Sequence, residues 1–136
     1  MKKIKYIILF ALLLFILAII AAFIFARSSC GKNIMGRYQF AENSLYEVVW
    51  ERMDCGATTS YREDIYILKK GESISWFTNP ILRADKSEDL RVSWLTPDQV
   101  EITFSNARIH SFKNYWYDQH ANGLETISIL LKQATE

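Results

Sequence analysis

The chain begins with a long apolar run and then changes to a different pattern. From Tyr6 to Ala26, 21 positions hold no charged residue, and Leu, Ile, Phe and Ala leave no polar stripe on any side. A helix of this length rises about 31 Å, close to the roughly 30 Å hydrocarbon core of a bilayer. A helix that is apolar all round has to be buried, so the run predicts a single transmembrane anchor over residues 6–26.

The later chain follows the two-residue period of half-buried strands. In LRVSWL (90–95) and VEITFS (100–105) every second residue is large and apolar, and TPDQ between them suits a tight reversal. These two runs predict an antiparallel hairpin. Other strand-like runs are YEVVWER (46–52), DIYILKKG (64–71), SISWFT (73–78) and NGLETISILLKQ (122–133).

One segment, residues 107–123, fits two patterns. Its apolar residues suit either a helical stripe or a strand face, and a seventh strand that runs into a loop is favoured. Several short strands separated by Gly, Pro, Asn and Asp are typical of an all-β fold, an antiparallel sandwich or open barrel. The expected order is a basic tip (1–5), the anchor (6–26), a junction (27–36) and a β domain (37–136).

Two alternatives to an uncleaved anchor remain open. A cleaved signal peptide usually has a shorter apolar run, of about 7–15 residues. A lipoprotein signal would attach lipid to Cys30, for which Ser28 and Ser29 fit, but Arg27 stands where an aliphatic residue is usual. The single-pass signal-anchor is therefore the preferred interpretation.

The basic residues beside the anchor predict its orientation. Lys2, Lys3 and Lys5 precede the apolar run, whereas Arg27 and Lys32 follow it. Because basic flanks stay on the cytoplasmic side, the N-terminus is expected in the cytoplasm. The protein is thus expected in the bacterial inner (cytoplasmic) membrane, with its C-terminal domain periplasmic or extracellular.

Charge narrows the range of partners. After the anchor the chain carries 13 of its 16 basic residues and all 15 acidic ones, a formal net charge of −2 with no long basic cluster. Nucleic acid is not an expected partner, because binding it needs clustered positive charge. The expected partners are the membrane and another protein of the envelope.

The only two cysteines, Cys30 and Cys55, allow several kinds of chemistry. The preferred hypothesis is a disulfide between them, since the domain is expected outside the reducing cytosol. A loop of about 25 residues closed in this way stabilises the fold by roughly 3–4 kcal/mol. The alternative is a thiol-dependent enzyme in which Cys55 is the nucleophile and His110 or His120 the base. No metal site and no cofactor are expected, because the histidines lack ligand spacing.

The aromatic run Tyr115-Trp116-Tyr117 is a possible partner-binding site. Exposed aromatic side chains stack on sugars and are enriched where proteins bind partners. The competing interpretation places Trp116 in the core with the two tyrosines beside it.

The stretch ERMDCGATTSYREDIYIL (51–68) resembles a group of small, uncharacterised bacterial envelope proteins. They share a hydrophobic N-terminal segment and a C-G-A-T-T motif after a strand, here Cys55 to Thr59. The later LRVSWLTPDQVEITF is similar to their tryptophan strand and the strand that follows it. This resemblance implies an envelope location and a β fold, and it implies no activity.

Together these patterns favour a non-enzymatic, membrane-anchored β domain that acts as an interaction or accessory protein of the envelope. Two alternatives stay open: the thiol-dependent enzyme centred on Cys55, and a small-ligand or glycan binder that uses Tyr115, Trp116 and Tyr117.

Overall fold

The computed structural model describes residues 2–28, 30–56, 59–120 and 123–134, with the side chains of 2–4, 7, 25–28 and 120 left undescribed. The chain forms two compact units, Met1–Gly31 and Lys32–Glu136.

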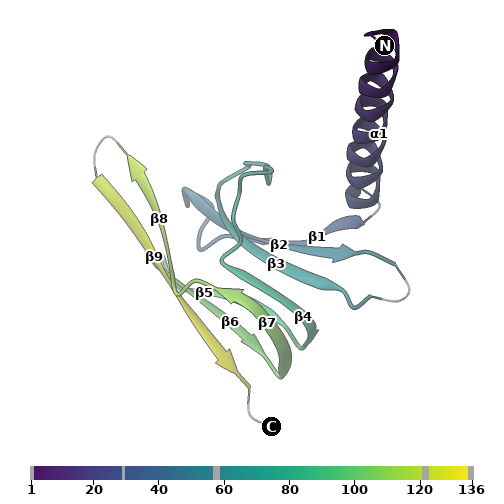
Figure 1. Cartoon of the computed structure of the whole chain (residues 1–136). Coiled ribbons are helices and arrows are strands. Elements are labelled where there is room, and N and C mark those ends of the chain that lie inside the picture. The colour runs from purple at the N-terminus through teal and green to yellow at the C-terminus, as the bar shows by residue number, and fades with distance from the viewer. Residues whose placement is uncertain (1, 29, 57–58, 121–122, 135–136) are drawn as a thin grey trace. The chain divides into compact units, whose positions relative to one another are not determined.

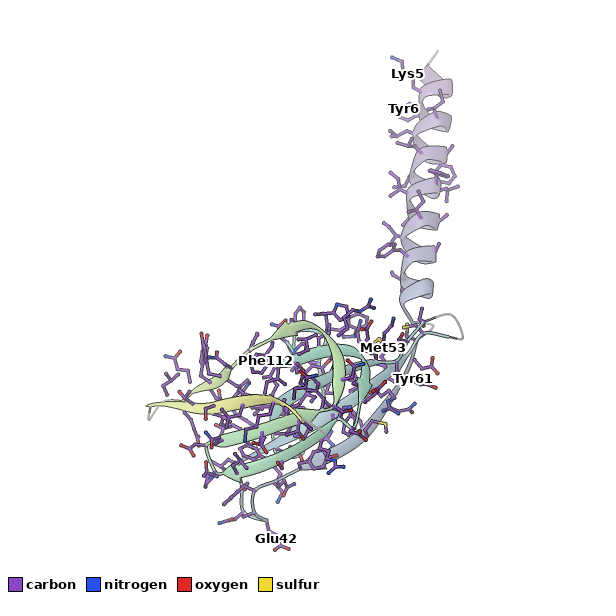
Figure 2. All side chains as sticks on the ribbon, turned by 90° about the horizontal axis from the view of Figure 1, so that it is seen from below. Lys5, Tyr6, Glu42, Met53, Tyr61 and Phe112 are labelled. Carbon is purple, nitrogen blue, oxygen red and sulfur yellow. The ribbon has the colours of Figure 1, made fainter. Side chains whose placement is uncertain are left out.

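The first unit is dominated by one helix, α1, which spans Lys2–Ser28. Its described side chains are exposed, and Figure 2 shows them radiating from the ribbon on all sides, Tyr6 among them. The N-terminal helix expected from the sequence is therefore present. Within the part of the chain that the structure describes, no helix combines the length and the apolarity needed to cross a membrane.

The second unit is built from strands in two sheets (Figure 1). The five-stranded sheet has the order β1-β2-β3-β4-β7, and the four-stranded sheet has the order β5-β6-β9-β8. The strands are β1 (Gly31–Tyr38), β2 (Tyr46–Asp54), β3 (Arg62–Lys69), β4 (Leu82–Glu88), β5 (Arg91–Thr96), β6 (Gln99–Phe104), β7 (Asn106–Phe112), β8 (Tyr115–His120) and β9 (Gly123–Gln133). The predicted all-β fold is confirmed.

The hairpin expected around TPDQ is also confirmed. Strands β5 and β6 pair antiparallel, with Val92 opposite Ile102 and Trp94 opposite Val100. Strand β9 departs from the antiparallel arrangement expected from the sequence, because it runs parallel to β6 and antiparallel to β8. The four-stranded sheet is thus mixed, which the hydrophobic period alone cannot indicate.

The core lies between the two sheets. Alternate residues of β2 and β3 face it from one sheet, and alternate residues of β5, β6 and β9 face it from the other. Its buried members are Tyr46, Val48, Ile65, Ile67, Ile81, Leu82, Leu90, Val92, Val100, Ile102, Phe104, Ile127 and Ile129. A hydrogen bond from the Trp94 indole Nε1 to the Tyr38 carbonyl (2.8 Å) links β5 to β1 and joins the two sheets at their outer strands.

The outer face of the five-stranded sheet is buried as well. Val49, Tyr66 and Leu68 form a second apolar cluster, against which Ile74 packs. Beside them Asp64 is buried and accepts two hydrogen bonds from Arg83, at 2.9 and 3.1 Å. Strand β3 is therefore covered on both faces, and the chain after it folds back over the sheet.

The local structure differs from the expectations in three places, although the strand favoured within residues 107–123 is present. The run SISWFT (73–78) forms a turn and no strand. Residues 107–120 form two strands, β7 and β8, with a break at Lys113 and Asn114. Strand β1 begins at Gly31 and so occupies part of the expected junction, while β4 was not predicted. In β4 the charged Arg83 alternates with buried apolar residues, and this charge hides the strand pattern.

Candidate functional site

A cavity of about 820 Å³ opens where the end of β3 meets the corner between β7 and β8. Its volume lies within the range of small-molecule sites, about 300–1,000 Å³. Three segments line it: the end of β3, the connection from β3 to β4, and the residues around the start of β8. The lining residues are Ile67, Leu68, Lys69, Glu72, Ser73, Ser75, Thr78, Asn79, Phe112, Lys113, Asn114, Tyr115, Trp116, Tyr117 and Asp118.

The aromatic run found in the sequence forms one side of this cavity. Successive side chains of a strand point to opposite faces, so Tyr115 and Tyr117 share one face of β8 and Trp116 takes the other. The two tyrosines are 55% and 60% exposed, and their rings stack with centroids 6.3 Å apart and planes inclined by 22°. We call this pair the tyrosine platform. Strand β8 is the outer strand of its sheet.

Trp116 anchors the site to the core. It packs against the core cluster, and its ring meets Tyr46 edge to face with centroids 5.0 Å apart. Trp116 is therefore half-buried against the core, and the tyrosines on either side of it are exposed. Asp118, two residues further along β8, accepts a hydrogen bond from the Tyr46 hydroxyl (3.3 Å) and pairs with the Lys69 ammonium (3.1 Å). Burial, together with the nearby Glu125 and Asp118 carboxylates, raises the pKa of Tyr46, so its hydroxyl stays a donor.

The opposite wall is the connection from β3 to β4. It begins at Gly71, whose φ of 78° suits glycine and whose amide donates to the Glu47 carboxylate (2.9 Å). Glu47 is buried and also accepts from Arg37, whose guanidinium bonds the Glu72 carbonyl at 3.2 and 3.3 Å. One buried carboxylate thus fixes the start of the wall to β1 and β2.

The far part of the wall is a tight turn from Ser75 to Thr78. The Thr78 amide donates to the Ser75 carbonyl (3.1 Å), and the Ser75 amide donates to the Thr78 hydroxyl (3.0 Å). The two hydroxyl oxygens also lie 3.0 Å apart, within hydrogen-bond distance. These bonds explain why SISWFT leaves the strand conformation in spite of its strand-like composition.

The lining has mixed chemistry but balanced charge. Two lysines, Lys69 and Lys113, are matched by two acids, Glu72 and Asp118. Three aliphatic hydroxyls and two side-chain amides come from Ser73, Ser75, Thr78, Asn79 and Asn114, and the aromatic run adds two phenolic hydroxyls and an indole N–H. A cavity with no net charge favours neutral polar ligands over phosphates or other anions.

The two cysteines are in the disulfide state, and no free cysteine occurs in the described part of the chain. Because the chain has only these two, Cys30 and Cys55 are bonded to each other, which confirms the predicted pairing. A disulfide sulfur is no thiolate, so a nucleophilic Cys55 would require the reduced protein.

The two histidines proposed as bases lie apart from Cys55 in the topology, as far as they are described. His110 is on β7, three strands from β2 in a sheet whose strands are about 4.8 Å apart, and its Nε2 lies 3.3 Å from Asp85. The side chain of His120 is outside the described residues. Arg108 also donates to Asp85 (2.7 Å), and this bond lowers the pKa of the carboxyl to about 2. Among the described residues no group of His, Cys, Asp and Glu is placed to hold a metal ion.

Sequence reasoning found one side of the cavity and missed the other. The aromatic run gave the tyrosine platform a visible signal, whereas Ser73 to Thr78 looked like a strand. The spacing of Ser75 and Thr78, three apart as in a tight turn, is the signal that could have revealed the wall.

No protein family, curated protein or solved structure matches this chain. The resemblance to small envelope proteins with a C-G-A-T-T motif therefore stays a prediction.

Proposed function

We propose that this protein is a membrane-anchored binding protein of the bacterial envelope whose β domain takes a saccharide at the cavity beside β8. The observation that carries the proposal is the tyrosine platform, which lines a cavity of about 820 Å³. The protein binds its ligand without transforming it, and it acts as an accessory component of the envelope.

The chemistry of the lining supports a saccharide in particular. A sugar ring offers a face of C–H groups, which pack against the electron-rich face of an aromatic ring. Its hydroxyls exchange hydrogen bonds with side chains such as Ser75, Thr78 and Asn79. Balanced charge in the cavity suits a neutral sugar and gives no attraction to a phosphate.

The proposal also includes a membrane anchor and a cellular location. In it, the uncharged run from Tyr6 to Ala26 holds the chain in the inner membrane, with the N-terminus in the cytoplasm and the β domain outside. The disulfide between Cys30 and Cys55 supports this orientation, because such bonds persist in oxidising compartments. The support for the span is the sequence run alone.

A co-sedimentation experiment tests the ligand class. The purified full chain in detergent is mixed with insoluble peptidoglycan sacculi, and the bound fraction is measured after centrifugation. We expect the double variant Tyr115→Ala/Tyr117→Ala to weaken binding about tenfold or more, because buried aromatic contacts of this kind contribute more than about 1.4 kcal/mol.

Another exposed tyrosine of the β domain provides a matched control. Tyr61 is 54% exposed, close to the exposure of the platform tyrosines, and it does not line the cavity. Tyr61→Ala should therefore bind sacculi like the unmodified chain. Absence of binding by the unmodified chain, or equal loss in both variants, would reject the saccharide. If the chain does not bind the saccharide and crosslinks to a specific envelope protein, a protein partner would be favoured.

A further inference from the structure

Two large aromatic side chains stand almost fully in solvent at the tip of the β3–β4 connection. Trp76 is 87% exposed and Phe77 is 92% exposed. Single exposed hydrophobic residues are common on soluble proteins, but two adjacent aromatics at this level of exposure lose the free energy that their burial would supply. Neither residue lines the cavity, although their neighbours Ser75 and Thr78 do.

The tip is held in one conformation. Trp76 and Phe77 are the two central residues of the turn that the Ser75 and Thr78 hydrogen bonds close. The Phe77 amide adds a bond to the Ser75 hydroxyl (3.3 Å). At the base, Ile74 packs into the apolar cluster on the outer face of the sheet. A turn tied in this way presents both rings without the ordering cost that a flexible loop would pay on binding.

A lysine in the segment that follows α1 lies beside this tip. The ammonium of Lys32, at the start of β1, lies 5.9 Å from the centre of the Trp76 ring. Helix α1 ends at Ser28, four residues before Lys32. Four residues span at most about 14 Å, so Lys32 stays within that distance of the helix end in any orientation of the helix.

We propose that the Trp76–Phe77 tip is a membrane contact that inserts into the headgroup layer of the bilayer that holds α1. Trp is enriched at this depth because its ring is apolar and its indole N–H is polar. Lys32 beside the ring supplies a cation for lipid phosphates. The inference rests on the proposed anchor, because only an inserted α1 keeps Lys32 near the headgroups.

Docking of the tip has a consequence for the cavity. Ser75 and Thr78 belong to the same turn and line the cavity wall, so a docked tip holds this wall close to the membrane surface. The saccharide site then opens near the bilayer, where the β domain meets glycans attached to or lying against the membrane.

Quenching of tryptophan emission by brominated lipid tests the contact. The full chain is reconstituted in phosphatidylcholine–phosphatidylglycerol vesicles, with or without bromine on the acyl carbons nearest the headgroup. The chain has four tryptophans. Subtracting the emission of Trp76→Phe, in which the replacement is still aromatic, isolates the contribution of Trp76. We expect this contribution to shift to shorter wavelength and to lose most of its intensity in brominated vesicles.

A second reporter controls for a domain that simply lies on the membrane. Leu45 is 68% exposed and directly precedes β2, in the connection that follows the end of β1 opposite to Lys32. Leu45→Trp in the Trp76→Phe background should emit as a solvent-exposed tryptophan and escape quenching. Equal quenching of the Leu45→Trp reporter would overturn the specific tip contact.

Vesicle flotation separates the two levels of the proposal. Protein that floats with the vesicles while Trp76 stays unquenched keeps the anchor and overturns the tip contact. Protein that fails to float overturns both. Flotation together with selective quenching of Trp76 supports both.

Discussion

Replacement of Glu47 tests how a buried carboxylate holds the cavity wall. Its Oε1 accepts hydrogen bonds from the Arg37 guanidinium and from the Gly71 amide (2.9 Å), and its Oε2 accepts a longer one from Gln39 (3.4 Å). Glu47 is buried, and the Arg37 guanidinium also donates to the Glu72 carbonyl at 3.2 and 3.3 Å. The perturbations are Glu47→Gln, which keeps the shape and removes the charge, and Glu47→Ala, which removes the acceptor.

The magnitudes follow from the partners. Hydrogen bonds to a charged group contribute about 1.5–3 kcal/mol and neutral ones about 0.5–1.5, so Glu47→Gln should cost about 1–2 kcal/mol. Breaking a buried pair costs about 3–5 kcal/mol. The Arg37 side chain is 37% exposed and can turn to water, which places Glu47→Ala near the lower end, at about 3 kcal/mol.

The assay is urea unfolding of the oxidised full chain in detergent, followed by tryptophan emission. With a slope of about 1–3 kcal/mol per molar urea, a cost of about 1–2 kcal/mol for Glu47→Gln should lower the midpoint by roughly 0.3–2 M. Hydrogen exchange at the Gly71 amide should speed up, because this amide loses its charged acceptor. Glu42→Gln is the matched control: Glu42 is exposed, and its variant should stay within about 0.5 kcal/mol of the unmodified chain.

An unchanged midpoint for Glu47→Gln, or a loss no larger than that of Glu42→Gln, would refute the reasoning. So would a lowered midpoint with unchanged exchange at Gly71, since the carboxylate would then stabilise the fold without holding the wall.

The remaining predictions concern a turn, a carboxyl and the disulfide. Gly71→Ala should lower the free energy of unfolding by about 1–2 kcal/mol, because an added Cβ meets no atom within 4 Å and the cost comes from the positive φ alone; Gly71→Asn should cost less in the same urea assay. The Arg108 hydrogen bond lowers the pKa of Asp85 to about 2, so its stabilisation is complete above about pH 4 and is lost as the pH falls from 4 to 2. The urea midpoints of Asp85→Asn and the unmodified chain should therefore differ at pH 6 and converge over that window; a constant difference would contradict the assignment. Cys30→Ser and Cys55→Ser should each cost about 3–4 kcal/mol, and both should match reduction of the unmodified chain, because all three remove one bond. Unequal losses, measured in the same assay, would mean that one cysteine has a second role.

The parts of the fold that were predictable are those where burial alone determines the pattern. Strands β5 and β6 have one solvent-exposed face and one buried face, so apolar and polar residues alternate visibly along their sequences. Strand β4 was missed because Arg83 and Asp85 on its outer face pair with Asp64 and Arg108. Such pairing depends on strands that are distant in the sequence, so it leaves no local signal.

The same division applies to the candidate site. Tyr115, Trp116 and Tyr117 were recognisable because three consecutive aromatics are conspicuous in any context. The turn around Trp76 was read as a strand, since Ile, Trp and Phe favour strands when packing decides. Here the Ser75 and Thr78 side chains bond to the backbone and decide the conformation instead.

The most direct test of the account is a nuclear magnetic resonance titration of the isotopically labelled full chain in micelles with a soluble N-acetylglucosamine tetrasaccharide. The account predicts shifts confined to the platform tyrosines, the Trp116 indole and the wall from Glu72 to Asn79, with no change at Arg83 on the outer face of the sheet. A spectrum that stays unchanged, or shifts that cluster away from the cavity, would contradict it.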